Sequence, residues 1–121
     1  MILRTGVDLI ETNRIADAIE RHGERFLNRV FTDYELNECK GRITSLAARF
    51  AAKEAVAKAL GTGIGDVSWL EIEIRSDEKK APYLVLSGEG EKLAEQLGLK
   101  TWSLSLSHIE SQAIAFVVAT E

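Results

Sequence analysis

The chain has 121 residues, 45% of them hydrophobic, and fits one domain over residues 1–121, because two separate cores would each be too small to offset chain entropy. The formal net charge of −4 argues against nonspecific nucleic-acid binding, which requires a basic surface. No signal peptide is visible and no apolar run approaches the roughly 18 residues of a membrane span, so we expect no membrane partner and a cytoplasmic location. The single cysteine, Cys39, cannot form an intramolecular disulfide.

The first half of the chain predicts one strand followed by helices. The opening segment carries β-branched and apolar residues, and Thr12 or Asn13 after it can cap a helix. An alanine-rich segment that ends at Gly61 predicts the longest helix and permits close backbone approach. The expected elements are a strand over residues 2–10, a helix from residue 12 or 13 to Gly23, and helices over residues 24–30, 33–40 and 45–60.

In the second half the period changes to two, which is typical of half-buried strands. Residues 70–75 alternate apolar with charged side chains, and residues 102–107 alternate apolar side chains with serine. The last strand is apolar on both faces, so it should be central in its sheet or covered by another subunit. We expect an α+β fold with an antiparallel sheet packed against the long central helix. The expected elements are strands over residues 70–75, 82–86, 102–107 and 113–119 and a helix over residues 89–97.

Two carboxylates are candidates for a metal site. Asp8 lies near the end of the first strand, and Glu54 lies in the middle of the alanine-rich helix. If the fold brings them together they can hold Mg²⁺, which prefers oxygen ligands and completes its octahedron with water and substrate phosphates. The residues alone leave simpler roles open, namely Asp8 as a helix cap and Glu54 in an ion pair with Lys58.

Basic groups on the same helix suggest polyphosphate binding. Arg49, Lys53 and Lys58 form a cationic set just before the glycine-rich loop Gly61 to Gly65. The loop follows a helix, whereas phosphate-binding glycine loops precede one, so helix termination plus a turn is the simpler interpretation. His108 closes the serine-alternating strand, where it can face a cleft, although a structural role is more common for such a histidine.

Three arginines suggest a docking surface for an acidic partner. At about 100° per residue, Arg14, Arg21 and Arg25 return to within roughly 20° of one helix face. Gly23 can break the helix before Arg25, which leaves Arg14 and Arg21 as the firm pair. A solvated charged face is the alternative interpretation.

These pieces, in this order, resemble the holo-acyl-carrier-protein synthase branch of the 4′-phosphopantetheinyl transferases. The most specific match is the run Arg49-Phe50-Ala51-Ala52-Lys53-Glu54-Ala55, combined with Gly6-Val7-Asp8 near the start of the chain. Further matches are Arg14-Ile15, Phe31-Thr32 with Glu35, Lys58-Ala59, Gly61 to Gly65, and Ser105 to His108. The chain departs from the family pattern at Lys80-Ala81-Pro82, where members often have Gly-x-Pro, and at Ala48, where many have glycine.

The resemblance implies a transfer reaction, in which a serine of acyl carrier protein attacks the β-phosphate of coenzyme A and releases 3′,5′-ADP. It implies that Asp8 and Glu54 ligate Mg²⁺, that Glu54 is the expected base, and that Lys58 stabilises the leaving phosphate. It also implies a homotrimer with each site at a subunit boundary.

Substrate contacts follow from the same resemblance. Coenzyme A is expected to bind Arg49, Lys58, His108, Gly63 and Gly65, with the two glycines beside the adenosine. The acidic acyl carrier protein is expected to dock on Arg14, Arg21 and Arg25.

Two other functions remain open on the residues alone. One is a metal-dependent phosphohydrolase, in which water replaces the serine, and the other is a noncatalytic module that binds coenzyme A or the carrier. Incubation with coenzyme A and Mg²⁺, with and without apo-acyl carrier protein, separates them: transfer needs the carrier, hydrolysis does not, and a module releases no 3′,5′-ADP.

Overall fold

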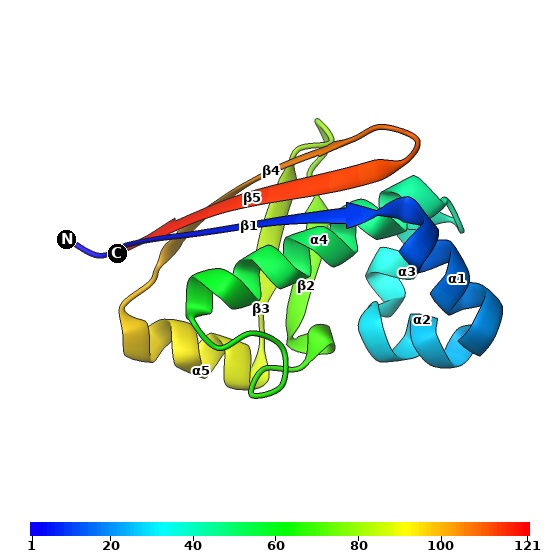
Figure 1. Cartoon of the computed structure of the whole chain (residues 1–121). Helices are drawn as coiled ribbons and strands as arrows, with labels where there is room; N and C mark the ends of the chain where they lie inside the picture. The colour runs from blue at the N-terminus through cyan, green and yellow to red at the C-terminus, as the bar shows by residue number, and fades with distance from the viewer.

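The computed structural model describes all residues, 1–121, as one α+β domain (Figure 1). Its elements are β1 (Leu3–Glu11), α1 (Thr12–His22), α2 (Glu24–Val30), α3 (Asp33–Cys39), α4 (Ile43–Leu60), a 3-10 turn η1 (Trp69–Glu71), β2 (Ile72–Ser76), β3 (Pro82–Leu86), α5 (Gly88–Leu97), β4 (Thr101–His108) and β5 (Gln112–Thr120).

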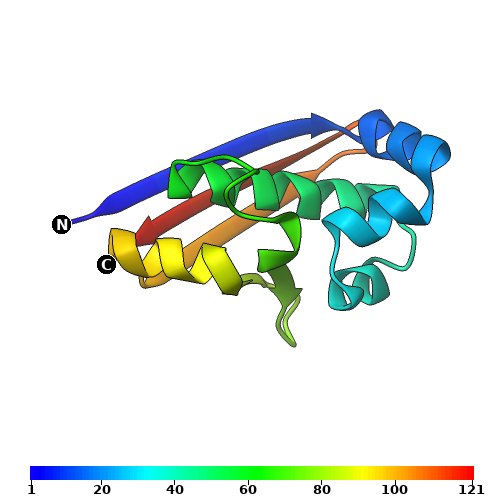
Figure 2. The same cartoon turned by 90° about the horizontal axis from the view of Figure 1, so that it is seen from below.

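The long helix α4 is sandwiched between a sheet and the remaining elements. The main sheet is antiparallel with strand order β1-β5-β4, and β2 and β3 form a separate antiparallel hairpin. α4 runs along one face of the main sheet, while α1, α2 and α3 gather at one end and α5 at the other (Figures 1 and 2). Eleven residues of α4 are buried, so it forms the centre of the core.

The two faces of the main sheet differ sharply in exposure. On β5, the residues that face α4 are buried, and they are Ala113, Ala115, Val117 and Ala119. The opposite face exposes Ile114 and Phe116 of β5 and Val7 and Leu9 of β1. These four residues lie opposite one another in the β1–β5 ladder, as Val7 with Phe116 and Leu9 with Ile114. We call them the outer apolar patch.

The predicted elements are found, with shifts at their ends. α4 begins two residues earlier than predicted, and residues 69–71 form the turn η1 rather than the start of a strand, which places Leu70 at the surface. The predicted side-chain cap of the first helix was wrong, because Thr12 is already helical and its hydroxyl donates to the Glu110 carbonyl instead (2.7 Å). Thr32 caps α3 in a capping box with Glu35.

No helix of the structure is both long enough and apolar enough to cross a membrane. Cys39 is the one cysteine and is fully buried, and burial raises the pKa of its thiol. The cytoplasmic location stays a prediction.

Candidate active site

Asp8, Glu54 and Lys58 meet where β1 crosses α4. Gly6 makes the crossing possible, because a Cβ at this position would overlap the backbone carbonyl of Ala55. β1 can therefore lie directly on the helix, and Asp8, on the same face of the strand as Gly6, comes next to α4. Small alanines on the helix complete the close approach. This explains why Gly-Val-Asp and an alanine-rich helix occur together in the sequence.

Lys58 joins the strand to the helix within this cluster. Its ammonium donates to the Val7 carbonyl (2.9 Å) and lies 3.4 Å from the Asp8 carboxylate. Lys58 is half exposed and Asp8 retains one-fifth of its side-chain exposure, so the pair is open to solvent and to a ligand. The two simpler roles considered above are not found: Asp8 caps no helix, and Lys58 pairs with Asp8 rather than with Glu54.

The charge of Glu54 is disfavoured in this position. Burial raises the pKa of the Glu54 carboxyl, and the negative charge of Asp8 raises it further. Lys58 and Arg14 oppose this shift, which shows that Arg14 of α1 lies close enough to act on the same carboxyl. Asp8 and Glu54 repel each other, and the cations Lys58 and Arg14 offset this repulsion only in part. A bound divalent cation would stabilise both carboxylates in their charged form.

The donor set at this site fits Mg²⁺. No group of three or more His, Cys, Asp or Glu side chains is arranged to enclose a metal ion. Asp8 and Glu54 supply only hard oxygen donors, and an octahedral Mg²⁺ bound to two carboxylates keeps positions for water and substrate phosphates. The chain thus supplies two carboxylate ligands for Mg²⁺ and leaves the other coordination positions to water and substrate.

Replacing Gly6 by Ala is expected to damage both fold and site. The added Cβ collides with helix backbone, so β1 must move away from α4, at a cost of at least about 2 kcal/mol in the free energy of unfolding. Gly41→Ala is the matched control, because its added Cβ meets nothing within 4 Å and only a φ of +76° opposes it. Thermal melts and transfer assays of both variants test this: equal melting temperatures would contradict the close approach.

A second cluster contains Arg49 and His108. They line a pocket of about 200 Å³ together with Ser76 and with Lys80 of the β2–β3 turn. The Arg49 guanidinium donates to the Ser76 hydroxyl (3.2 Å), while its buried Nε has no partner. Lys80 has a φ of +69°, a conformation that glycine adopts readily, which agrees with the Gly-x-Pro family pattern from which the chain departs at this position. The pocket is lined by cationic side chains, as an anion site would be.

The structure separates this pocket from the carboxylate cluster of the same chain. Arg49 and Lys58 are nine residues apart on α4, and at 100° per residue they point in opposite directions. The coenzyme A contacts expected at Arg49, Lys58 and His108 therefore cannot surround one phosphate within one chain. Gly63 and Gly65 follow α4 on the Lys58 side, in a loop with φ values of +70° and +146°.

Lys53 was wrongly predicted as part of the phosphate-binding set. It is fully buried and pairs with the equally buried Glu35 at 2.7 Å. Its side chain points from α4 toward α3 and β2 rather than toward either cluster. The sequence alone could not distinguish Lys53 from Arg49 and Lys58, because all three lie on the same predicted helix.

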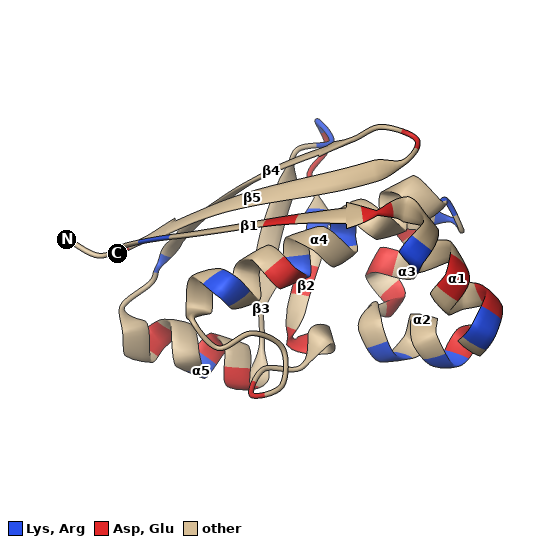
Figure 3. Cartoon of the chain, viewed as in Figure 1, with Lys and Arg blue, Asp and Glu red and all other residues tan.

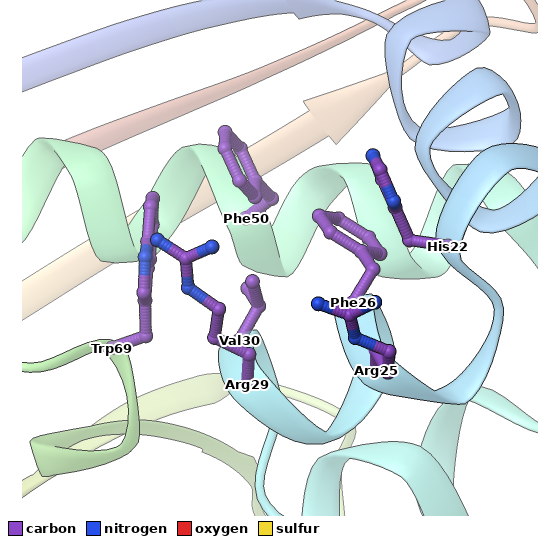
Figure 4. A pocket seen from close by; sticks show the side chains of 7 residues that line it. All are labelled: His22, Arg25, Phe26, Arg29, Val30, Phe50 and Trp69. Carbon is purple, nitrogen blue, oxygen red and sulfur yellow. The ribbon is translucent and has the colours of Figure 1, made fainter.

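A basic and aromatic pocket adjoins the carboxylate cluster. Its volume is about 350 Å³, and its lining residues are Phe26, Val30, Phe50, Trp69, His22, Arg25 and Arg29 (Figure 4). Phe50 lies one turn before Glu54 on α4, so the pocket and Glu54 share a helix face. We call it the aromatic pocket.

The three arginines predicted to form a stripe do not share one helix. α1 carries Arg14 and Arg21, both exposed, and ends before Gly23, which has a φ of +55°. Arg25 lies on α2, at the aromatic pocket with Arg29. Figure 3 shows basic and acidic segments interspersed on α1 and α2. Arg29 and the pocket aromatics were missed, although the Arg25–Arg29 spacing of one helical turn was visible.

An open two-carboxylate site beside a lysine, with a cationic pocket elsewhere on the chain, is typical of enzymes that transfer phosphate-linked groups. A model of the 4′-phosphopantetheinyl transferase superfamily matches residues 4–117. The holo-acyl-carrier-protein synthase of Halothermothrix orenii is 49% identical over 124 residues, which cover 100% of this chain and 99% of the relative.

Solved structures agree with the sequence relatives. The holo-acyl-carrier-protein synthase of Helicobacter pylori in complex with coenzyme A has a TM-score of 0.88 and 36% identity, covering 96% of this chain and 99% of that chain. The enzyme of Neisseria meningitidis has a TM-score of 0.89 and 39% identity, covering 98% of both chains. This chain belongs to the 4′-phosphopantetheinyl transferase superfamily, which confirms the predicted family and fold class.

Proposed function

We propose that this chain transfers the 4′-phosphopantetheine arm of coenzyme A to a serine of apo-acyl carrier protein, giving holo-carrier and 3′,5′-ADP. The observation that carries the proposal is the Asp8–Glu54–Lys58 cluster, in a chain whose full length matches holo-acyl-carrier-protein synthases. The serine oxygen forms a bond to the β-phosphorus, the bond from that phosphorus to the bridging oxygen breaks, and the serine proton leaves to a base.

Each residue of the cluster has a distinct role in this reaction. Glu54 is the candidate base, directly or through a water molecule, because the fold holds its carboxylate beside Asp8 and Lys58, where the reacting groups would meet. Lys58 is half exposed and holds its ammonium beside Asp8, where it can stabilise charge on the leaving phosphate. Asp8 and Glu54 would hold Mg²⁺, which, when bound, supplies neutralisation of the pyrophosphate charge.

The active site is proposed to combine residues of two subunits. Within one chain Arg49 and His108 face away from Asp8, Glu54 and Lys58, so the two groups cannot surround the same phosphate. A neighbouring subunit is proposed to supply its own cationic pocket to the carboxylates, and the outer apolar patch, on the opposite face of β1 from Asp8, is proposed as a surface where subunits meet. The exposure of Leu9 (58%) and Phe116 (45%) supports a covered interface at that patch.

A homotrimer, which the family resemblance implies, is the expected assembly at micromolar concentration, and Phe116→Asp is expected to dissociate it. The substitution places a charge in an apolar interface, so the monomers should separate and transfer should fall to background. Light scattering combined with a transfer assay measures both. A monomeric Phe116→Asp variant with wild-type activity would show that the site is complete within one chain.

The carrier is proposed to dock on α1 and at the aromatic pocket. Arg14 and Arg21 lie on α1, and Arg25 and Arg29 add positive charge beside three aromatic side chains. An acidic helix of the carrier would find charge complementarity at the arginines and apolar contact in the pocket. Because Arg14 also acts on Glu54, carrier docking and chemistry are adjacent.

The test is incubation with coenzyme A and Mg²⁺, with and without apo-acyl carrier protein. We expect 3′,5′-ADP only when the carrier is present, together with a carrier mass increase equal to one phosphopantetheine. Release of 3′,5′-ADP without the carrier would indicate a phosphohydrolase. Binding without any release would indicate a noncatalytic module.

A further inference from the structure

The Glu35–Lys53 ion pair has no part in the proposed chemistry, although both side chains are completely buried. The ammonium nitrogen and the carboxylate oxygen are 2.7 Å apart, and each side chain has 0% exposure. Burial lowers the pKa of the Lys53 ammonium, and the Glu35 charge opposes that shift. Buried ion pairs are poor sources of stability, because desolvation of two charges offsets their attraction. Stability alone therefore gives little reason for this pair.

Every hydrogen-bonding group of the pair has a partner, and these partners come from several segments. Besides Glu35, the Lys53 ammonium donates to the carbonyls of Trp69 (2.9 Å), the first residue of η1, and Ile72 (2.8 Å), the first residue of β2. The Glu35 carboxylate accepts from the backbone N–H of Thr32 (2.9 Å) and of Ile74 (2.8 Å). One pair of side chains thus links α4, the α2–α3 junction, η1 and β2.

These segments supply the walls of the aromatic pocket. Phe50 comes from α4, one turn before Lys53, and its ring packs on Trp69 of η1 with 4.8 Å between centroids. Lys53 lies 5.8 Å from the ring centroid of Phe31, which in turn makes an edge contact with Phe26 of α2 at 6.1 Å. The ion pair lies behind the pocket and connects its three walls.

We propose that Glu35 and Lys53 are positioning residues that set the spacing of the aromatic pocket for the carrier. The inference rests on the proposed function, because that function assigns the carrier to this pocket. Phe31, Glu35 and Lys53 form a buried unit, and the partly buried Thr32 joins it through its backbone N–H.

Two variants separate the pair's charge from its links to the turn η1. Glu35→Gln keeps one side-chain oxygen, enough to accept from one of the backbone N–H groups of Thr32 and Ile74, and leaves Lys53 bonded to Trp69 and Ile72. Glu35→Gln with Lys53→Met removes those two bonds as well and leaves no buried charge. In the double variant we expect the KM for the carrier to rise about tenfold, as for loss of a charge-assisted hydrogen bond. The KM for coenzyme A should stay within about twofold, since its contacts lie elsewhere.

Trp69 provides a readout that needs no transfer activity. The chain has two tryptophans, so a Trp102→Phe background leaves Trp69 as the only indole. In that background the double variant should show red-shifted emission and stronger acrylamide quenching, while Glu35→Gln, which keeps the Lys53 bonds to Trp69 and Ile72, should change the emission less. A parent that transfers nothing would refute the proposed function and leave this fluorescence comparison valid.

A folded double variant with unchanged Trp69 emission and unchanged carrier KM would overturn the proposal. If the double variant does not fold, hydrogen exchange of the parent decides. A positioning role requires that the hydrogen bonds of the ion pair stay formed in the native state. The Ile74 amide, which donates to Glu35, should then exchange only through global unfolding. Exchange of that amide through frequent local opening would overturn the proposal equally.

Discussion

Asp8→Asn and Glu54→Gln are each expected to lower kcat/KM for transfer by at least about 10³-fold, which corresponds to about 4 kcal/mol of transition-state stabilisation. Each substitution keeps the size of the side chain and removes one of the two carboxylates that meet between β1 and α4. Residual activity should require much more Mg²⁺, because a single carboxylate remains to hold it. Steady-state kinetics over a Mg²⁺ titration measure both effects.

Stability should change little or improve in these variants. The raised pKa of Glu54 reflects burial and repulsion from Asp8, and Glu54→Gln relieves both. Glu95→Gln is the matched control, since Glu95 is exposed on α5, at the other end of the molecule from α1. Near-normal rates at ordinary Mg²⁺ for either site variant, with the control also normal, would remove both residues from the catalytic centre.

Local patterns in the sequence predicted most of the secondary structure. Glycines end the helices at Gly23, Gly61 and Gly98, and alternation marks β4, because these signals depend on neighbours along the chain. The meeting of Asp8 with Glu54 was suggested by the family resemblance and not by spacing. Its physical cause, the backbone contact of Gly6 with Ala55, depends on how two distant elements cross.

The role of Lys53 shows where sequence reasoning fails. Lysine is almost never fully buried unless it is paired, and its partner Glu35 lies eighteen residues earlier on another helix. The spacing from Thr32 to Glu35 is that of a capping box, which could have identified Glu35 as a helix-capping carboxylate but not as a buried one, because Glu71 forms the same box with Ser68 without being buried. No local pattern identified the aromatic pocket, because its walls come from α2, α4 and η1.

Reversing Arg21 and Arg25 to Glu is expected to raise the KM for the carrier by about tenfold to a hundredfold at low salt, with the KM for coenzyme A nearly unchanged. Both arginines are exposed, and Arg25 lines the aromatic pocket. Arg14 is left intact, because its charge lowers the pKa of Glu54, so its reversal would disturb the catalytic carboxyl along with docking.

The salt dependence of the carrier KM distinguishes a docking surface from a charged face that contacts only solvent. The Debye length is about 10 Å at 0.1 M ionic strength, so salt should weaken the attraction of the parent enzyme for an acidic carrier and reduce the difference between parent and variant. Lys92→Glu with Lys100→Glu is the matched control: it changes the net charge equally, on residues exposed in and after α5. Equal carrier KM values for the two double variants would mean that net charge alone acts. An unchanged KM in the Arg21 and Arg25 variant would mean that the carrier docks elsewhere.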